Sequence, residues 1–445
     1  MAATLAEERL GNRKEGLLAN VVTLATGSVI AQLIALASAP LVTRLFGPEV
    51  YGLLGIFLSL GAVLVPLSTL AYSQAVAFPK SELEAQHLMW LSIGIATALA
   101  LMILPVLLLF AEQISLTLGA ETAIPALWLL SPLVFFGGTQ QTASQYLVRQ
   151  RKFRTVSLSD SSQSAVAAAL KVTWGLLSPS ALVLVVSTVS ARFVHAIGLL
   201  GGVLSLRRSG PVTFDPLSLA TLRAVASKYK DFPLFRAPQN FLNALSRNLP
   251  IVILGSLFGP AIAGHYALGH RVLQLPIALL SQAIGRAMLP RLAARVHRSE
   301  SLGPTLWKST AVLAAVGIVP FGVVVAFGPD LFGFVFGSDW VIAGRYARWL
   351  SVWLYFGFVD VPAVQVLPFV QAQRFLLIWE IVSSALKVTV LVVAALAGMQ
   401  PVVAVAGYSL VGAVAYVVLI AVSYAKVLQG RYRELEASPD VTRGG

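Results

Sequence analysis

The sequence has no cysteine and few charged residues. Without Cys, disulfide bonds and metal ions held by thiolates are excluded. Charged residues make up only 11% of the 445 residues, hydrophobic residues make up 57%, and the mean hydropathy is +0.81. A soluble domain of this size does not need such a composition, which is typical of a membrane protein with several spans.

The sequence also lacks the motifs of common enzyme chemistry. No stretch fits G-x-x-x-x-G-K-[ST], H-E-x-x-H or G-x-S-x-G, and the five histidines are scattered. We therefore predict a transporter and no enzyme, with no cofactor. The formal net charge of +13 comes mostly from basic residues between apolar segments. Such residues orient a chain in the bilayer, so we expect no nucleic-acid partner.

Apolar segments of about twenty residues or more recur along the whole chain. They fall at about 20–46, 51–78, 87–110, 123–148, 156–177, 181–206, 232–258, 262–290, 306–328, 343–370, 375–398 and 402–427. Each is long enough to cross a bilayer as a helix, so we predict an all-α polytopic protein with about twelve transmembrane helices. When loops are assigned alternately to the two sides, the basic residues collect on one side, and the positive-inside rule places both termini in the cytoplasm.

One short motif occurs twice. Leu45-Phe46-Gly47-Pro48 followed by Gly52 recurs as Leu257-Phe258-Gly259-Pro260 followed by Gly264, and three weaker matches follow in the same order. Six predicted spans separate the copies, which predicts two pseudo-symmetric six-helix lobes of the same orientation. We predict an N-terminal lobe at 1–206, a cytoplasmic linker at 207–230, a C-terminal lobe at 231–428 and a cytoplasmic tail at 429–445. The linker either forms an interfacial helix or is solvated.

The segment that begins near Lys230 carries polar residues along an apolar span. Arg236, Asn240, Asn243 and Arg247 lie at i, i+4, i+7 and i+11, a spacing that places them on one helical face over roughly 16 Å. An Arg within the membrane costs about 2.5 to 3.5 kcal/mol. This polar seam should therefore face protein or a watery cavity.

Other spans carry further polar and charged residues at comparable depth. The candidate cavity residues besides the seam are Arg192, His195, Arg271, Gln274, Lys171 and Lys387. Acids at such depth are few, and those that could hold a coupling Na⁺ or H⁺ are Asp160, Asp360 and Glu380. Together these groups predict a positively charged interior that suits an anionic substrate such as a phosphate. The alternatives are that the cations reach the membrane surface or pair privately, and that the acids pair with the lysines.

The stretch Thr26–Gly52, and above all its turn Thr43-Arg44-Leu45-Phe46-Gly47-Pro48-Glu49-Val50-Tyr51-Gly52, resembles a known family. It is similar to the Wzx-type oligosaccharide flippases of the polysaccharide transporter family, in the multidrug, oligosaccharidyl-lipid and polysaccharide (MOP) exporter superfamily. The resemblance implies a MATE-like fold in the bacterial inner membrane and alternating access by rocking of the lobes. The implied substrate is a polyprenyl-pyrophosphate-linked oligosaccharide repeat unit for O-antigen, capsule or exopolysaccharide. Membrane lipids and a polysaccharide polymerase are the further implied partners.

Two other functions remain open at this point. One is a cation-coupled multidrug exporter of the same fold, which would need accessible acids in its cavity. The other is a flippase of a peptidoglycan-precursor lipid, although members of that family have two further helices, which a chain of this length hardly accommodates. For the Wzx-type function, the favoured phosphate contacts are Arg192, Arg236 and Arg247.

Overall fold

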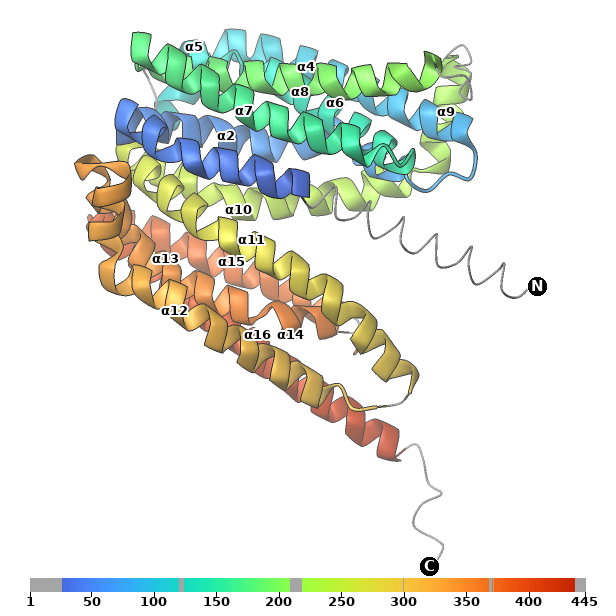
Figure 1. The fold of residues 1–445 in the computed structure, drawn as a ribbon, viewed down its shortest axis with the longest axis vertical. Helices are drawn as coiled ribbons and strands as arrows, with labels where there is room; N and C mark the ends of the chain where they lie inside the picture. Colours follow the sequence, from blue (N-terminus) through green and yellow to red (C-terminus); the bar gives the residue numbers. More distant parts are fainter. Residues whose placement is uncertain are drawn as a thin grey trace, which may run out of the picture. The chain divides into compact units, whose positions relative to one another are not determined.

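The computed structural model describes residues 26–119, 124–208, 218–298, 300–367, 370 and 372–436. All regular elements within these ranges are helical, which confirms the predicted all-α class (Figure 1). The first part contains the helix Thr26–Leu45, α2 (Pro48–Ser68), α3 (Tyr72–Ala75), α4 (Glu82–Thr117), α5 (Ile124–Leu127), α6 (Leu130–Arg149), α7 (Phe153–Leu177), α8 (Ala181–Arg208) and α9 (Leu219–Lys228). The second part contains the π-helical turn η2 (Phe232–Arg236), α10 (Ala237–Phe258), α11 (Pro260–His297), α12 (Gly303–Phe336), the 3₁₀ turn η3 (Ser338–Trp340), α13 (Val341–Val359), α14 (Val361–Val366), α15 (Gln373–Leu396) and α16 (Pro401–Glu436).

The long helices correspond to the twelve predicted spans. Within the described ranges, nine helical segments are long and apolar enough to cross a membrane. The remaining predicted spans are α6, α7 and α11, with 20, 25 and 38 residues. They have the length to cross but are more polar, since α7 carries Asp160 and Lys171 and α11 carries Arg271 and Gln274. Interior charges are not confined to these three spans, since Arg192 lies on α8, Arg247 on α10 and Lys387 on α15.

The chain breaks inside one segment that was predicted to be continuous. The predicted segment 51–78 ends its first helix at Ser68, and Leu70 and Ala71 then adopt φ values of 46° and 60° before α3 begins. Neither residue is Gly or Asn, the residue types that usually take this left-handed conformation. The tertiary packing of the buried Ala71 and Tyr72 therefore sets this turn, and local propensity does not.

The chain forms two compact units, residues 1–264 and 265–445. In the first unit α4 packs on α6, α8 packs on both α6 and α7, and α2 packs on α10. In the second unit α13 packs on both α12 and α16, and α16 packs on α15. The first unit ends at residue 264, one helix after residue 231, where the C-terminal lobe is predicted to begin. Helix α10 therefore belongs to the first unit. The predicted six-helix lobes remain a prediction.

Both copies of the duplicated motif join two helices, but the glycine before the proline differs in conformation, with a φ of −65° at Gly47. Pro48 is the first residue of α2 and Pro260 the first residue of α11, the position where proline is favoured because it needs no hydrogen-bond donor. Gly259 has a φ of 96°, which only glycine adopts readily. Each motif therefore ends one helix and starts the next within a few residues.

The glycines of the two motifs bring the two copies together within the first unit. A Cβ atom added to Gly52 would lie 1.8 Å from the carbonyl oxygen of Pro260, and one added to Gly264 would lie 2.0 Å from the carbonyl oxygen of Pro48. In both cases the obstacle is backbone. The start of α2 and the first turn of α11 thus pack backbone to backbone, and we call this contact the glycine crossing.

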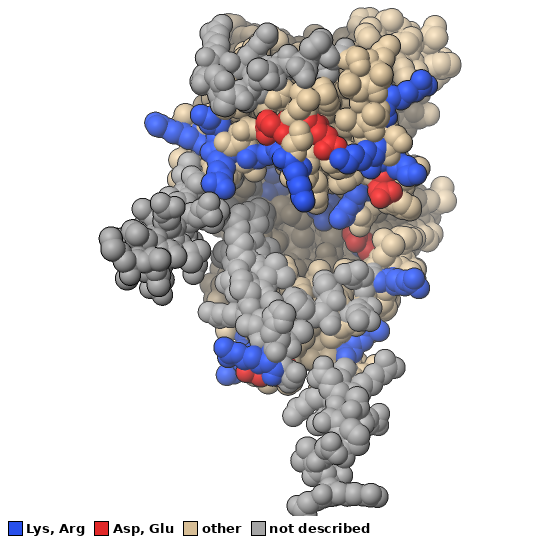
Figure 2. Space-filling model, turned by 90° about the vertical axis from the view of Figure 1, so that its right-hand side faces the viewer, with Lys and Arg blue, Asp and Glu red and all other residues tan. Residues whose placement is uncertain are grey.

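The short helix α9 packs against α4 within the first unit. Val225 is buried in the hydrophobic core that also contains Tyr146, and the Tyr72 hydroxyl donates a 3.0 Å hydrogen bond to the carbonyl oxygen of Ala226. Lys228 pairs with Glu84 of α4, and this contact raises the pKa of the Lys228 ammonium. Lys and Arg side chains gather on the molecular face at the α9 end, among fewer acids (Figure 2).

Candidate functional site

The polar seam lies on η2 and α10. Arg236 is exposed and donates from its Nη1 to the Gln239 Oε1 at 3.2 Å, while Arg247 is also exposed. Asn240 and Asn243 lie between them and are half-buried. The sequence-predicted seam residues therefore keep access to the space beside the helix.

The same face of α10 changes character along its length. Leu254 follows Arg247 by two helical turns, so the two side chains project from the same face. Leu254 is fully buried, in the part of the first unit where α2 packs on α10, whereas Arg247 is exposed. The face is thus closed by packing at its Leu254 end and open where its cations and amides lie.

Helices α7 and α8 hold a second polar group in the first unit. His195 is 1% exposed, its Nδ1 contacts the Gln163 Oε1, and its Nε2 lies 3.2 Å from the Asp160 Oδ1. His195 was predicted as a substrate contact and Asp160 as a coupling acid. The structure places the two groups as neighbours, and both roles stay predictions. Sequence spacing could not show this contact, because the residues lie on different helices.

Arg192 lies one turn before His195 on α8. Its Nε is buried, and within the described part of the chain this atom has no hydrogen-bond partner. Phe193 beside it contacts Phe136 of α6 with ring centroids 5.2 Å apart, so α6 and α8 are in close contact at this level. A guanidinium with an unmet donor is suited to binding an anion, because an unpaired buried donor costs about 1 to 3 kcal/mol or more. Lys171, also predicted for the cavity, is half-buried on α7 and interacts within the chain.

The second unit holds the remaining predicted residues. Arg271 is exposed, and the Gln274 Nε2 lies 3.3 Å from the His270 Nε2. The Lys387 ammonium lies over the rings of Trp353 and Tyr408. These two cations therefore have different surroundings: Arg271 is exposed, whereas Lys387 lies against aromatic rings.

The two acids predicted for the second unit differ strongly in exposure. Asp360 is 2% exposed, and its Oδ1 has no hydrogen-bond partner among the residues that the structure describes. Glu380 is exposed on α15. Over the described ranges, no three His, Cys, Asp or Glu side chains come together as metal ligands would.

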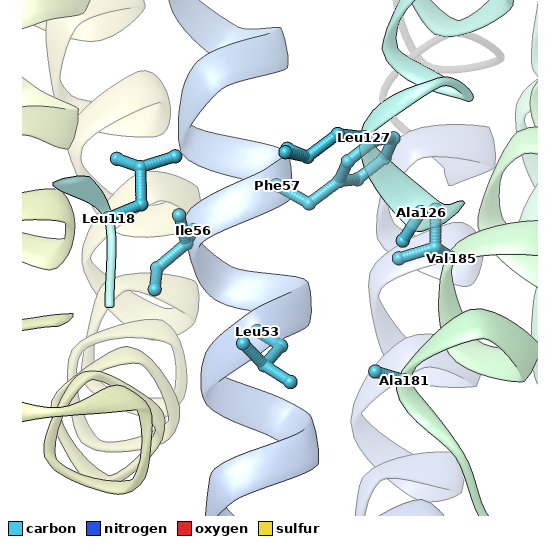
Figure 3. A pocket seen from close by; sticks show the side chains of 8 residues that line it. All are labelled: Leu53, Ile56, Phe57, Leu118, Ala126, Leu127, Ala181 and Val185. Atoms are coloured by element: carbon cyan, nitrogen blue, oxygen red, sulfur yellow. The ribbon is translucent and has the colours of Figure 1, made fainter. Parts of the chain in front are cut away.

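A pocket in the first unit is apolar throughout (Figure 3). Its lining residues are Leu53, Ile56, Phe57, Leu118, Ala126, Leu127, Ala181 and Val185. No side chain in this set can donate a hydrogen bond. The pocket therefore does not suit a phosphate or a sugar, and the polar groups described above are the better candidates.

A sequence profile of the family described as "Polysaccharide biosynthesis protein" matches residues 41–344, more than half of the chain. The chain belongs to this family. Among curated relatives, this polysaccharide biosynthesis family member is 24% identical over 310 residues to the succinoglycan biosynthesis transport protein ExoT of Rhizobium meliloti (strain 1021). The match covers 69% of the chain but only 60% of that relative's length.

Solved structures support the MOP-type fold of this polysaccharide biosynthesis family member. An inward-facing multidrug resistance MATE transporter of the MOP superfamily has a TM-score of 0.71 at 14% identity, covering 91% of this chain and 95% of its own. The lipid II flippase MurJ in an inward closed conformation has a TM-score of 0.66 at 13% identity, covering 94% and 92%. The predicted fold class is thereby confirmed, while identities this low show the fold alone.

Proposed function

We propose that this protein is a flippase that moves polyprenyl-pyrophosphate-linked oligosaccharide repeat units across the bacterial inner membrane by alternating access. The observation that carries the proposal is the seam on η2 and α10, with Arg236 and Arg247 exposed on one face of a predicted span. Family membership and the similarity to a succinoglycan transport protein support the same substrate class.

The chemistry of the seam fits such a substrate. A pyrophosphate presents several oxygens, and a guanidinium can bind two of them at once in a fixed geometry. Asn240 and Asn243 lie between the two arginines and offer amide donors and acceptors for sugar hydroxyls or phosphate oxygens. Arg192 supplies a further cation in the same unit. In this proposal, the prenyl chain stays in lipid while the charged head group passes along the seam.

Cation export is the second candidate function, and the MATE-like fold favours it. An organic cation needs an accessible carboxylate. Of the three acids in the predicted spans, Asp160 lies beside His195 and Asp360 is buried. Glu380 is exposed, but the seam offers positive charge, so an anionic substrate suits the described residues better. Coupling to Na⁺ or H⁺ through an acid, cytoplasmic termini, the lobe boundaries and a polymerase partner belong to the same proposal.

The test is a flipping assay in proteoliposomes with a short-chain polyprenyl-pyrophosphate oligosaccharide. We expect Arg247→Ala and Arg236→Ala each to lower the initial rate by about tenfold or more, because a charge-assisted contact contributes about 1.5 to 3 kcal/mol. Arg247→Lys should restore part of the rate, since it keeps the charge and loses the bidentate geometry. Lys308→Ala, which removes an exposed cation of α12, is the control.

Unchanged flipping by the Arg236→Ala/Arg247→Ala double variant at normal protein level would remove the seam from the substrate path. If the wild-type protein instead moves an organic cation and leaves the lipid-linked oligosaccharide in place, the second candidate function is correct.

A further inference from the structure

An aromatic cluster in the second unit surrounds a lysine, and four helices contribute to it. Tyr266 and His270 come from α11, Trp353 from α13 and Tyr408 from α16, while Lys387 enters from α15. Tyr266, Trp353 and Tyr408 are between 2% and 7% exposed. These residues lie far apart in the sequence, so only the fold brings them together.

The rings pack as a continuous wall. His270 stacks on Tyr266 with centroids 5.7 Å apart and on Trp353 at 6.0 Å. Tyr408 meets the edges of Tyr266 at 6.3 Å and of Trp353 at 5.1 Å. Each ring therefore contacts at least two others, and the wall is held in place independently of the lysine.

The ammonium of Lys387 lies against the faces of two of these rings. Its Nζ is 5.1 Å from the Trp353 centroid and 5.7 Å from the Tyr408 centroid, within the roughly 6 Å at which a cation is attracted to an aromatic face. No hydrogen bond or ion pair of this ammonium occurs in the described part of the unit. Glu380, on the same helix, is two turns away and exposed.

The groups facing the ammonium are thus almost all aromatic. The titratable rings of the cluster are His270 and Tyr266 on α11 and Tyr408 on α16, and none of the three carries a negative charge near neutral pH. The carboxylate whose charge acts on the ammonium is that of Glu380, two turns away on the same helix. The charge of Lys387 is compensated mainly by ring quadrupoles, which is how proteins bind alkylammonium ligands. The site resembles an ammonium-binding site that already holds its ligand.

We propose that Lys387 occupies, as a tethered cation, an aromatic site in the second unit that would otherwise accept a free alkylammonium ion. The chain supplies this positive charge covalently, so a free cation does not enter the site in the native protein. Lys387 is then a specificity-determining residue that keeps organic cations out of this unit. The proposal concerns a cation site and does not depend on the flippase function.

The test uses the full-length protein, purified and reconstituted, with n-propylammonium chloride as the probe. Lys387→Ala removes three methylene groups and the ammonium, which are the atoms of n-propylammonium. We expect the melting temperature of the variant to fall, and n-propylammonium to recover at least half of the loss with saturable concentration dependence, because a ligand that binds only the folded state stabilises it. Sodium chloride and n-propanol at the same concentrations should recover little.

Three matched proteins control for general effects of the probe. Wild-type protein, Lys387→Met, which fills the space without charge, and Lys308→Ala, which removes an exposed cation of the same unit, should show no saturable response to n-propylammonium. A second variant, Lys387→Ala/Trp353→Leu, should lose the recovery because one ring face of the site is gone.

The proposal is overturned if n-propylammonium stabilises wild type and Lys387→Ala equally, or if n-propanol works as well as the ammonium. If Lys387→Ala does not fold, Lys387→Met and Lys387→Arg provide the decision. Arg should retain the wild-type melting temperature better than Met, because it keeps a cation over the rings. Equal stability of these two variants would contradict the proposal.

Discussion

The glycine crossing can be tested with a single added carbon. Gly52→Ala places a Cβ 1.8 Å from the carbonyl oxygen and 2.7 Å from the carbonyl carbon of Pro260. Ordinary contact between such atoms begins near 3.5 Å. Since the obstacle is backbone at the start of a helix, no side-chain rotation can relieve the overlap. The two helices must separate by more than an ångström.

Such overpacking costs typically 1 to 3 kcal/mol, and a backbone obstacle places Gly52→Ala at the upper end, so we expect about 3 kcal/mol. Gly264→Ala should behave alike, because its Cβ would lie 2.0 Å from the carbonyl oxygen of Pro48. Gly94→Ala on α4 is the matched control, since nothing lies within 4 Å of its Cβ. That variant should be neutral or stabilised by up to about 1 kcal/mol, because Ala is a better helix former than Gly.

The assay is equilibrium or thermal unfolding of each purified variant, combined with flipping in proteoliposomes. The double variant Gly52→Ala/Gly264→Ala should cost clearly less than the sum of the single variants, since the first Cβ already opens the gap that the second one needs. If Gly52→Ala is as stable as Gly94→Ala, or if the two costs add fully, the backbone contact of the glycine crossing does not exist as described.

Two further predictions concern carboxylates. Glu82→Gln should lower the free energy of unfolding by about 1 kcal/mol, because Glu82 pairs with the Arg149 Nε at 3.2 Å in a partly exposed site. Glu112→Gln, on an exposed part of the same helix, should leave it unchanged. Unfolding measurements on both variants check this. Asp360→Asn should leave the melting temperature unchanged or raise it, because the amide keeps the shape and removes the cost of burying a charge. A large drop for Asp360→Asn would show that the carboxylate charge is bound by a cation.

Much of the fold could be predicted because its signals are local. The length of each apolar segment indicates a span, and the duplicated Leu-Phe-Gly-Pro motif places a helix end and a helix start in both copies. Proline at the first helical position favours a helix start in both copies, because its missing N–H has no partner there in any helix. The twelve long helices within the described ranges therefore follow from the sequence.

The contacts between distant segments could not be predicted. Nothing in the sequence around Gly52 indicates that its partner is the other copy of its own motif. The Asp160 and His195 pair lies on two helices, and Lys387 is one of several interior cations until the fold places Trp353 and Tyr408 beside it. Each of these contacts depends on how the helices pack, which residue spacing within one sequence does not show.

The candidate site illustrates the same division. The seam spacing from Arg236 to Arg247 follows from helical geometry, so those residues share a face wherever α10 lies. The closure of that face at Leu254 depends on α2 and could not be predicted from α10 alone. Sequence spacing thus predicts which side chains point together, and packing decides which of them stay accessible.

The lengths of α4, α12 and α16 have a consequence for the surrounding lipid. With 36, 34 and 36 residues, these helices are about 50 to 54 Å long, against a hydrocarbon thickness of about 30 Å. Even a tilt of about 40° leaves roughly 10 Å outside the acyl chains. When the bilayer becomes thicker or thinner, the edge of its hydrocarbon layer can therefore move along these helices. The protein should tolerate bilayers of different acyl-chain length without rearranging its helices.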